Sequence, residues 1–224
     1  MKIKTVDLAR EYRVGSSKIM AVNKVNLEAD EAEFIAIVGP SGSGKSTLLN
    51  LIGLNDYPTH GKIFVGDADA SLLSGGERRK LRLFRMGFVF QTFNLLPTLN
   101  AAENVELPMA LAGKSQKEQA KRATKLLESV GLGNRLSHRP KELSVGEMQR
   151  VAIARALAND PEIIIADEPT GELDSKTAKE IIALLSDVNR GERATVVVAT
   201  HDESIVDVAD TIYTIQDGKL RLEG

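Results

Sequence analysis

The stretch of the chain that decides its fold is a glycine-rich segment that reads Gly39, Pro40, Ser41, Gly42, Ser43, Gly44, Lys45, Ser46 and Thr47. It fits the pattern G-x-x-x-x-G-K-[ST] and lies between the apolar run Phe34–Val38 and a helical pattern that begins near Lys45. In such a loop the backbone N–H groups surround phosphate oxygens, and the helix N-terminus adds partial positive charge. Lys45 would reach the β- and γ-phosphates, and the Ser46 hydroxyl would ligate Mg²⁺. A chance glycine-rich turn is the alternative, and the strand-to-helix context argues against it.

A second apolar run, residues 163–166, delivers two adjacent acids at its end, Asp167 and Glu168. Asp167 can hold Mg²⁺ through water, as the Walker B aspartate does in phosphate-loop enzymes. Glu168 could orient and deprotonate an attacking water. The alternative is a strand that simply ends in solvated acids. The presence of the phosphate loop in the same chain favours a catalytic site at these two acids over that alternative.

Short apolar runs alternate with helical patterns along the chain, which predicts an α/β fold with a mainly parallel sheet. Three more runs of this kind occupy residues 88–90, 196–199 and 212–215. Residues 3–8 and 21–27 instead alternate apolar and polar side chains, which is typical of a half-exposed antiparallel sheet at the edge. The pair Asp217-Gly218 predicts a hairpin near the C-terminus.

The middle of the chain, from residue 98 to about 158, has helical periodicity. Ser115 and Glu118 form a capping-box pattern, and Gly131 is the residue type that ends a helix. Between them one apolar face is expected, made of Ala120, Ala123, Leu127 and Val130. The charges within residues 75–85 and 113–125 are interpreted as solvated helix faces. These patterns predict a helical subdomain inserted in the α/β core.

Composition excludes several classes of protein. The 224 residues are 42% hydrophobic and 27% charged, which excludes disorder as the main state. The absence of cysteine excludes disulfide scaffolds, cysteine-based zinc sites and thiol catalysis. A net charge of −2 provides no basic field, so no nucleic-acid partner is expected. With no signal-peptide pattern and no apolar run near the ~20 residues that span a bilayer, we expect an intracellular chain that does not itself cross a membrane.

These motifs, taken together, resemble the ATPase subunit of ATP-binding cassette (ABC) transporters, from the first strand to the C-terminal hairpin. Gln91 resembles the Q-loop glutamine, which contacts Mg²⁺ and senses the membrane partner. Residues 143–147 and the MQRVAIARAL that follows resemble the family signature. Asp174, within TGELDS, resembles the D-loop aspartate at the dimer interface, and His201 resembles the switch histidine that holds the γ-phosphate. Tyr12 lies at the position of the aromatic residue that stacks on adenine.

Each of these residues also has a simpler interpretation. Gln91 could be a polar strand terminus, His201 a helix-capping loop residue and Tyr12 a half-buried residue of an edge strand. The apolar region 93–111 is interpreted mostly as packing. In the family, however, this neighbourhood helps to form the groove that receives the coupling helix of the transporter.

The sequence contains two candidates for the signature. LSGGE at residues 73–77 matches the family's LSGGQ better than LSVGE at residues 143–147, but it precedes Gln91. The family's signature follows the Q-loop and comes shortly before the Walker B strand, so the second segment is chosen. Ser74 with Glu77 is interpreted as a helix cap only.

The chosen signature departs from the family's pattern, since Val145 replaces a glycine and Glu147 replaces glutamine. Ser144 and Glu147 would cap a helix, and the resemblance implies that Ser144, Gly146 and Glu147 also bind nucleotide across a dimer. A backbone N–H survives at Val145, so phosphate binding is possible there unless the position needs φ > 0.

The resemblance implies a single ABC ATPase domain over residues 1–224. Its core would be a RecA-like P-loop NTPase with a mainly parallel sheet and an N-terminal antiparallel β subdomain, over about 1–91 and 159–224. The inserted helical subdomain would cover about 92–158. The catalytic residues would be Lys45, Gln91, Glu168 and His201, with Mg²⁺ on Ser46, Gln91 and Asp167.

The implied function is ATP binding and hydrolysis by a head-to-tail pair of copies that drives a separate permease from the cytoplasmic face of the membrane. DEPTGELDS and residues 104–108 resemble the lipoprotein-release and macrolide-export group. The alternative is the ATPase subunit of a solute importer. A non-transport ABC ATPase acting on DNA has less support, because the chain has no coiled-coil heptads and no cysteines. A small-molecule kinase would share the phosphate loop but not the ordered signature and histidine.

Overall fold

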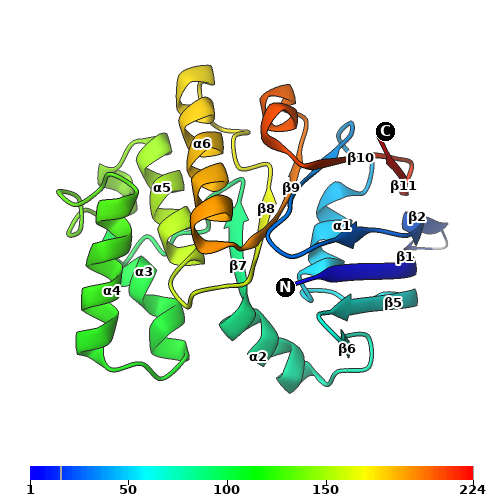
Figure 1. Cartoon of the computed structure of the whole chain (residues 1–224), viewed down its shortest axis with the longest axis horizontal. Helices are drawn as coiled ribbons and strands as arrows, with labels where there is room; N and C mark the ends of the chain where they lie inside the picture. Colours follow the sequence, from blue (N-terminus) through cyan, green and yellow to red (C-terminus); the bar gives the residue numbers. More distant parts are fainter. Residues whose placement is uncertain (16, 224) are drawn as a thin grey trace.

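The computed structural model describes residues 1–15 and 17–223, and its centre is a six-stranded sheet in the order β11-β10-β4-β9-β8-β7 (Figure 1). Its strands are β4 (Phe34–Val38), β7 (Met86–Phe90), β8 (Ile163–Asp167), β9 (Thr195–Thr200), β10 (Thr211–Gln216) and β11 (Lys219–Leu222). Neighbouring strands are parallel except for β11, which returns antiparallel to β10. The turn between them is the predicted hairpin, and Asp217 and Gly218 both have positive φ there.

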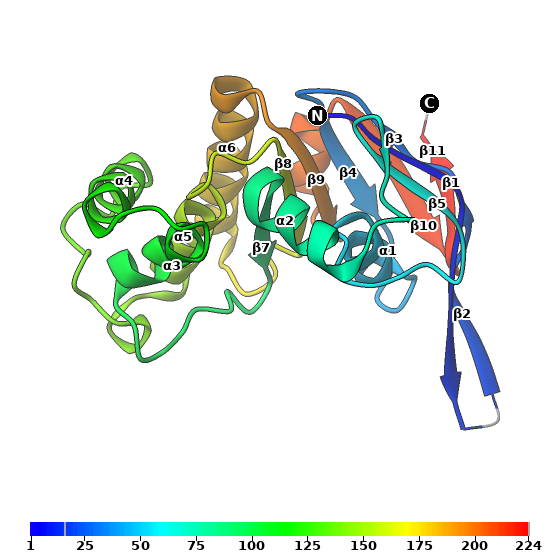
Figure 2. The same cartoon turned by 90° about the horizontal axis from the view of Figure 1, so that it is seen from below.

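A second sheet is antiparallel, as the alternating pattern at the N-terminus predicts. It contains β1 (Ile3–Val14), β2 (Ser17–Val25), β3 (Glu28–Ala29), β5 (His60–Val65) and β6 (Ala68–Asp69). The first two strands extend beyond the predicted segments and form a hairpin that projects from the body (Figure 2). His60 is the first residue of β5 and pairs with Ala9 of β1.

The helices are α1 (Lys45–Ile52), α2 (Gly75–Arg85), α3 (Ala101–Leu111), α4 (Gln116–Ser129), α5 (Val145–Ala156) and α6 (Ser175–Glu192), with 3-10 turns at Pro140–Glu142 and Glu203–Val208. In both views α3, α4 and α5 gather at the end of the molecule opposite the antiparallel sheet (Figures 1 and 2). This confirms the helical insertion, although residues 131–139 within it form turns rather than helix. None of the described helices is both long and apolar enough to cross a membrane.

The core lies on both faces of the parallel sheet. Along β4, Phe34 and Ala36 belong to the hydrophobic cluster that includes α5 and α6, whereas Ile35 and Ile37 belong to the cluster that includes α1 and the antiparallel sheet. Successive side chains of a strand point to opposite faces, so both faces must be covered. The fold therefore explains why this strand is apolar at every position.

Two expectations about the helix surfaces need correction. Arg78 in α2 is only 1% exposed, although the charges of this segment were expected to be solvated. Its guanidinium lies 4.0 Å from the centre of the Tyr57 ring and donates to the backbone carbonyls of Asp56 and Ala70, which replace water. On α4, Ala120 is exposed, whereas Ala123, Leu127 and Val130 are buried as expected.

Candidate nucleotide site

The phosphate loop turns tightly around the side chain of Lys45, the first residue of α1. Lys45 is only 6% exposed, and its Nζ donates to the carbonyls of Gly39 (2.7 Å) and Pro40 (3.1 Å). Gly44 has φ +109°, and a Cβ there would lie 2.2 Å from the carbonyl oxygen of Ala21. Only glycine fits this position, so the last glycine of the motif allows the loop to pack against β2.

Glu168 and His201 meet Lys45 at the carboxyl end of the parallel sheet. Glu168 follows β8, and its backbone N–H donates to the carbonyl of Ala199 in β9 at 2.8 Å. Its carboxylate lies 3.4 Å from Lys45 Nζ and 2.8 Å from His201 Nδ1. Glu168 has φ +46°, a left-handed conformation that costs about 1–3 kcal/mol and that the surrounding structure must hold. This backbone conformation places the carboxylate between the Lys45 ammonium group and the His201 ring.

Asp167, the last residue of β8, has the properties of a cation ligand. Its Oδ1 is buried and has no hydrogen-bond partner among the described residues. Burial raises the pKa of the Asp167 carboxyl, and a hydrogen bond with Ser46 opposes that rise. A divalent cation would satisfy an unpaired buried carboxylate oxygen, so Ser46 and Asp167 fit Mg²⁺.

Lys45, Ser46, Glu168 and His201 border a cavity of about 560 Å³, a volume typical of small-ligand sites, whereas Asp167 is not part of its lining. Its lining is Ala21, Ser41, Gly42, Gly44, Lys45, Ser46, Thr47, Gln91, Glu168 and His201. Gln91 reaches it from the end of β7, and its Nε2 donates to Glu172 Oε1 at 3.2 Å. Glu172 was not singled out from the sequence, because nothing in the motif pattern indicates that it contacts the glutamine.

Tyr12 does not line this cavity. It lies on the projecting β1–β2 hairpin, and its hydroxyl donates to Asp56 Oδ2 at 2.9 Å. The guanidinium of Arg10 lies 4.7 Å from the centre of the Tyr12 ring, and it also donates to Asp56. The side chain is 37% exposed. The structure thus ties Tyr12 to the loop that follows α1.

The residues predicted to form the signature also lie outside this cavity. Ser144 and Glu147 form the predicted capping box at the start of α5. A Cβ on Gly146 would lie 2.6 Å from Thr177 Cγ2, so a larger residue there would displace the Thr177 side chain of α6. Val145 is 42% exposed and is not among the described residues with positive φ, so its side chain imposes no strain on the helix start.

Asp174 caps α6, and its carboxylate accepts hydrogen bonds from the backbone N–H groups of Lys176 and Thr177. The hydroxyl and backbone N–H of Thr177 lower the pKa of the Asp174 carboxyl most. Ser74 and Glu77 form an equivalent capping box at the start of α2. Local geometry therefore does not separate the two LSGGE-like segments.

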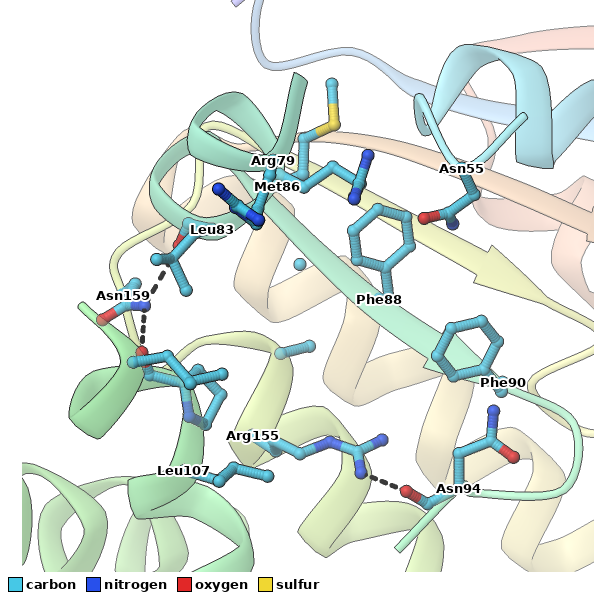
Figure 3. A pocket seen from close by; sticks show the side chains of 15 residues that line it. Asn55, Arg79, Leu83, Met86, Phe88, Phe90, Asn94, Leu107, Arg155 and Asn159 are labelled. Atoms are coloured by element: carbon cyan, nitrogen blue, oxygen red, sulfur yellow. Dashed lines mark hydrogen bonds between the residues drawn. The ribbon is translucent and has the colours of Figure 1, made fainter. Parts of the chain in front are cut away.

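A second cavity, of about 380 Å³, lies between α2, β7 and α3 (Figure 3). The stacked rings of Phe88 and Phe90, with centres 6.1 Å apart, line it together with Leu107. Three arginines also border it: Arg79, Arg82 and Arg155. We call this cavity the groove.

A parallel sheet, a phosphate loop at the start of α1 and an acid at the end of β8 define a phosphate-loop nucleotide-binding protein. The family model described as ABC transporter matches residues 22–171. The chain is 50% identical over 219 residues to an ABC transporter ATP-binding protein of Thermotoga maritima, covering 98% of this chain and 92% of the relative. The chain belongs to the ABC transporter ATP-binding family.

The chain is also similar to a solved structure and to a longer transport protein. A solved dimeric structure of the ATP-binding cassette MJ0796, bound to ADP and Pi, superposes with a TM-score of 0.92 at 45% identity, covering 99% of this chain and 97% of that one. MJ0796 comes from Methanocaldococcus jannaschii. The macrolide export ATP-binding/permease protein MacB of Rhodopirellula baltica is 46% identical over 218 residues, which cover 96% of this chain and 32% of that protein.

Proposed function

We propose that the chain binds ATP and hydrolyses it to drive a membrane permease made by separate chains. The observation that carries this proposal is the convergence of Lys45, Glu168 and His201 beside the phosphate loop. A nucleotide bound there would place its terminal phosphate next to one fixed ammonium group and one carboxylate. That pairing suits attack by water on phosphorus.

The chain's own residues would divide the work of hydrolysis. Glu168 would take a proton from water as the water oxygen bonds to the γ-phosphorus and the bond to the leaving oxygen breaks, which yields ADP and phosphate. Lys45 and His201 would offset the charge on the transferring group. In the structure both already contact Glu168, so the entering phosphate would take over these two contacts.

Ser46, Gln91 and Asp167 would hold Mg²⁺ beside the phosphates. When bound, the ion would neutralise charge on phosphate oxygens. The support for this site is the buried, unpaired Oδ1 of Asp167 and its hydrogen bond with Ser46.

A second copy of the chain would complete each site. Ser144, Gly146, Glu147 and Asp174 do not line the cavity of their own chain, which agrees with contacts to the nucleotide of a partner copy. The dimeric MJ0796 structures support such a pairing. By the family resemblance Tyr12 would stack on adenine, and to do so its ring would have to exchange the contact with Arg10 for the base, because it lies outside the cavity in this structure.

The groove would receive a segment of the permease. The two phenylalanines and three arginines that line it favour a segment that is apolar and carries an acidic side chain.

In the proposed assembly residues 92–158 would act as the helical subdomain, and residues 1–91 with 159–224 as the core. The chain would thereby lie at the cytoplasmic face of the membrane, and its similarity to MacB favours an export-type or lipoprotein-release system over a solute importer.

The turnover of Glu168→Gln tests the chemistry. If Glu168 is the principal base, turnover should fall by about 10²–10⁴-fold while Mg-ATP binding is retained. Glu180→Gln is the matched control, since Glu180 lies on α6 and pairs with Arg150 away from the cavity. Normal turnover in Glu168→Gln would remove this residue from the mechanism.

A further inference from the structure

Arg155 joins the helix that carries the signature to the segment that carries Gln91. It lies in the last turn of α5, and its guanidinium donates to the carbonyl of Phe93 at 2.7 Å. The same guanidinium donates to the carbonyl of Asn94, as the dashed line in Figure 3 shows. The partners lie 62 and 61 residues away in sequence, so no local pattern indicates this contact.

The segment held by Arg155 has an unfavourable backbone. Phe93 has φ +61° and Asn94 has φ +48°, so two successive residues are left-handed. Asparagine tolerates this conformation, whereas phenylalanine does so rarely. A turn of this kind persists only where the surrounding structure holds it. Gln91 lies two residues before Phe93, so its position depends on this turn.

Arginine suits this position better than lysine would. Its planar fork can donate to two successive carbonyls, whereas an ammonium group acts as a single point of charge. No carboxylate among the described residues forms an ion pair with Arg155, so the two backbone carbonyls are its principal partners. Burial also lowers the pKa of the guanidinium, consistent with a side chain enclosed between the groove and the turn.

We infer that Arg155 is a positioning residue that holds Gln91 in its working place through the turn at residues 92–94. The inference rests on the role proposed above for Gln91. Arg155 lines the groove together with Phe90 and Asn94, so a segment docked there would contact both the guanidinium and the turn that it holds. The contact thereby links docking of a partner to the nucleotide site.

A double-mutant cycle on the full chain tests the inference. Arg155→Ala should lower kcat by about 10- to 100-fold, the effect of a misplaced group, with KM for Mg-ATP changed by less than about 2-fold. Gln91→Ala should also lower kcat, and the double variant should be no slower than Gln91→Ala alone. A merely structural role for Arg155 would instead add its own loss in the double variant.

Arg122→Ala is the matched control. Arg122 also donates to a backbone carbonyl near the end of α5, that of Leu157, but it contacts neither the turn nor the cavity. Its variant should retain kcat.

The outcomes distinguish the proposed role of Gln91 in hydrolysis from the inferred role of Arg155 in positioning Gln91. A normal kcat in Gln91→Ala would remove Gln91 from the mechanism and this inference with it. A slow Gln91→Ala with a normal Arg155→Ala, or with fully multiplied losses in the double variant, would overturn the inference alone. If Arg155→Ala does not fold, Arg155→Lys replaces it in the same cycle. Adding Asn94→Gly should then restore part of its kcat, because glycine adopts positive φ freely, and no restoration would count against the inference.

Discussion

Ser144 and Ser74 cap their helices in the same way, so replacing each by arginine gives a matched pair of variants. The backbone N–H of Glu147 lies 3.2 Å from Ser144 Oγ, and that of Glu77 lies 3.4 Å from Ser74 Oγ. Both substitutions remove one such bond, so each should cost about 1 kcal/mol of stability. At this chain length that corresponds to about 2–4 °C in Tm.

The two variants should differ only in assembly. In the Glu168→Gln background, Ser144→Arg should abolish the ATP-dependent dimer, because the larger side chain enters the space proposed for the partner's nucleotide. Ser74→Arg should leave the dimer intact. Calorimetry measures the Tm of each variant, and gel filtration with ATP measures the dimer. An intact dimer in Ser144→Arg together with a lost dimer in Ser74→Arg would refute the assignment of the signature to residues 143–147.

Three further predictions concern binding and stability. Lys45→Ala should weaken Mg-ATP binding in a calorimetric titration, since it removes the cation from the phosphate loop, and unchanged affinity would contradict the loop's role. Arg78→Ala should lower the free energy of unfolding in urea by about 2–4 kcal/mol, because it empties a buried volume and leaves carbonyls unpaired, whereas the neighbouring Arg79→Ala should change it by less than about 0.5 kcal/mol. The Ser115 hydroxyl and backbone N–H hold the pKa of the Glu118 carboxyl below 4.5 in the folded chain. The stability advantage over Glu118→Gln should therefore be full above pH 4.5 and shrink as the pH falls through the folded pKa, and a gap that widens in acid would disprove this assignment.

Those parts of the fold that depend on neighbours in sequence could be predicted from the sequence. The strand Phe34–Val38, its loop and the start of α1 were predicted together, because a buried strand, glycines and a lysine follow one another in a fixed order. The capping boxes at Ser115 and Ser144 were also confirmed, since each needs only a pattern of four residues.

The features that could not be predicted from the sequence depend on contacts between segments that are distant along the chain. The left-handed backbone of Glu168 and its contact with Lys45 arise only when β8 lies beside β9 and α1. The burial of Arg78 requires carbonyls from Asp56 and Ala70, which an amphipathic pattern cannot reveal. Likewise, the hydrogen bonds from Arg155 to the carbonyls of residues 93 and 94 join positions 62 and 61 residues apart in the sequence. Charged side chains whose partners are backbone carbonyls leave no complementary charge in the sequence.

The central claim is that the cavity at Lys45 and Glu168 is one part of an ATP site that a second copy of the chain completes. The most direct measurement is the mass of Glu168→Gln in solution, by light scattering coupled to gel filtration, with and without ATP. The account predicts a monomer of 24.3 kDa without nucleotide and twice that mass with ATP. A Glu168→Gln chain that binds ATP and remains at the mass of a monomer would contradict it.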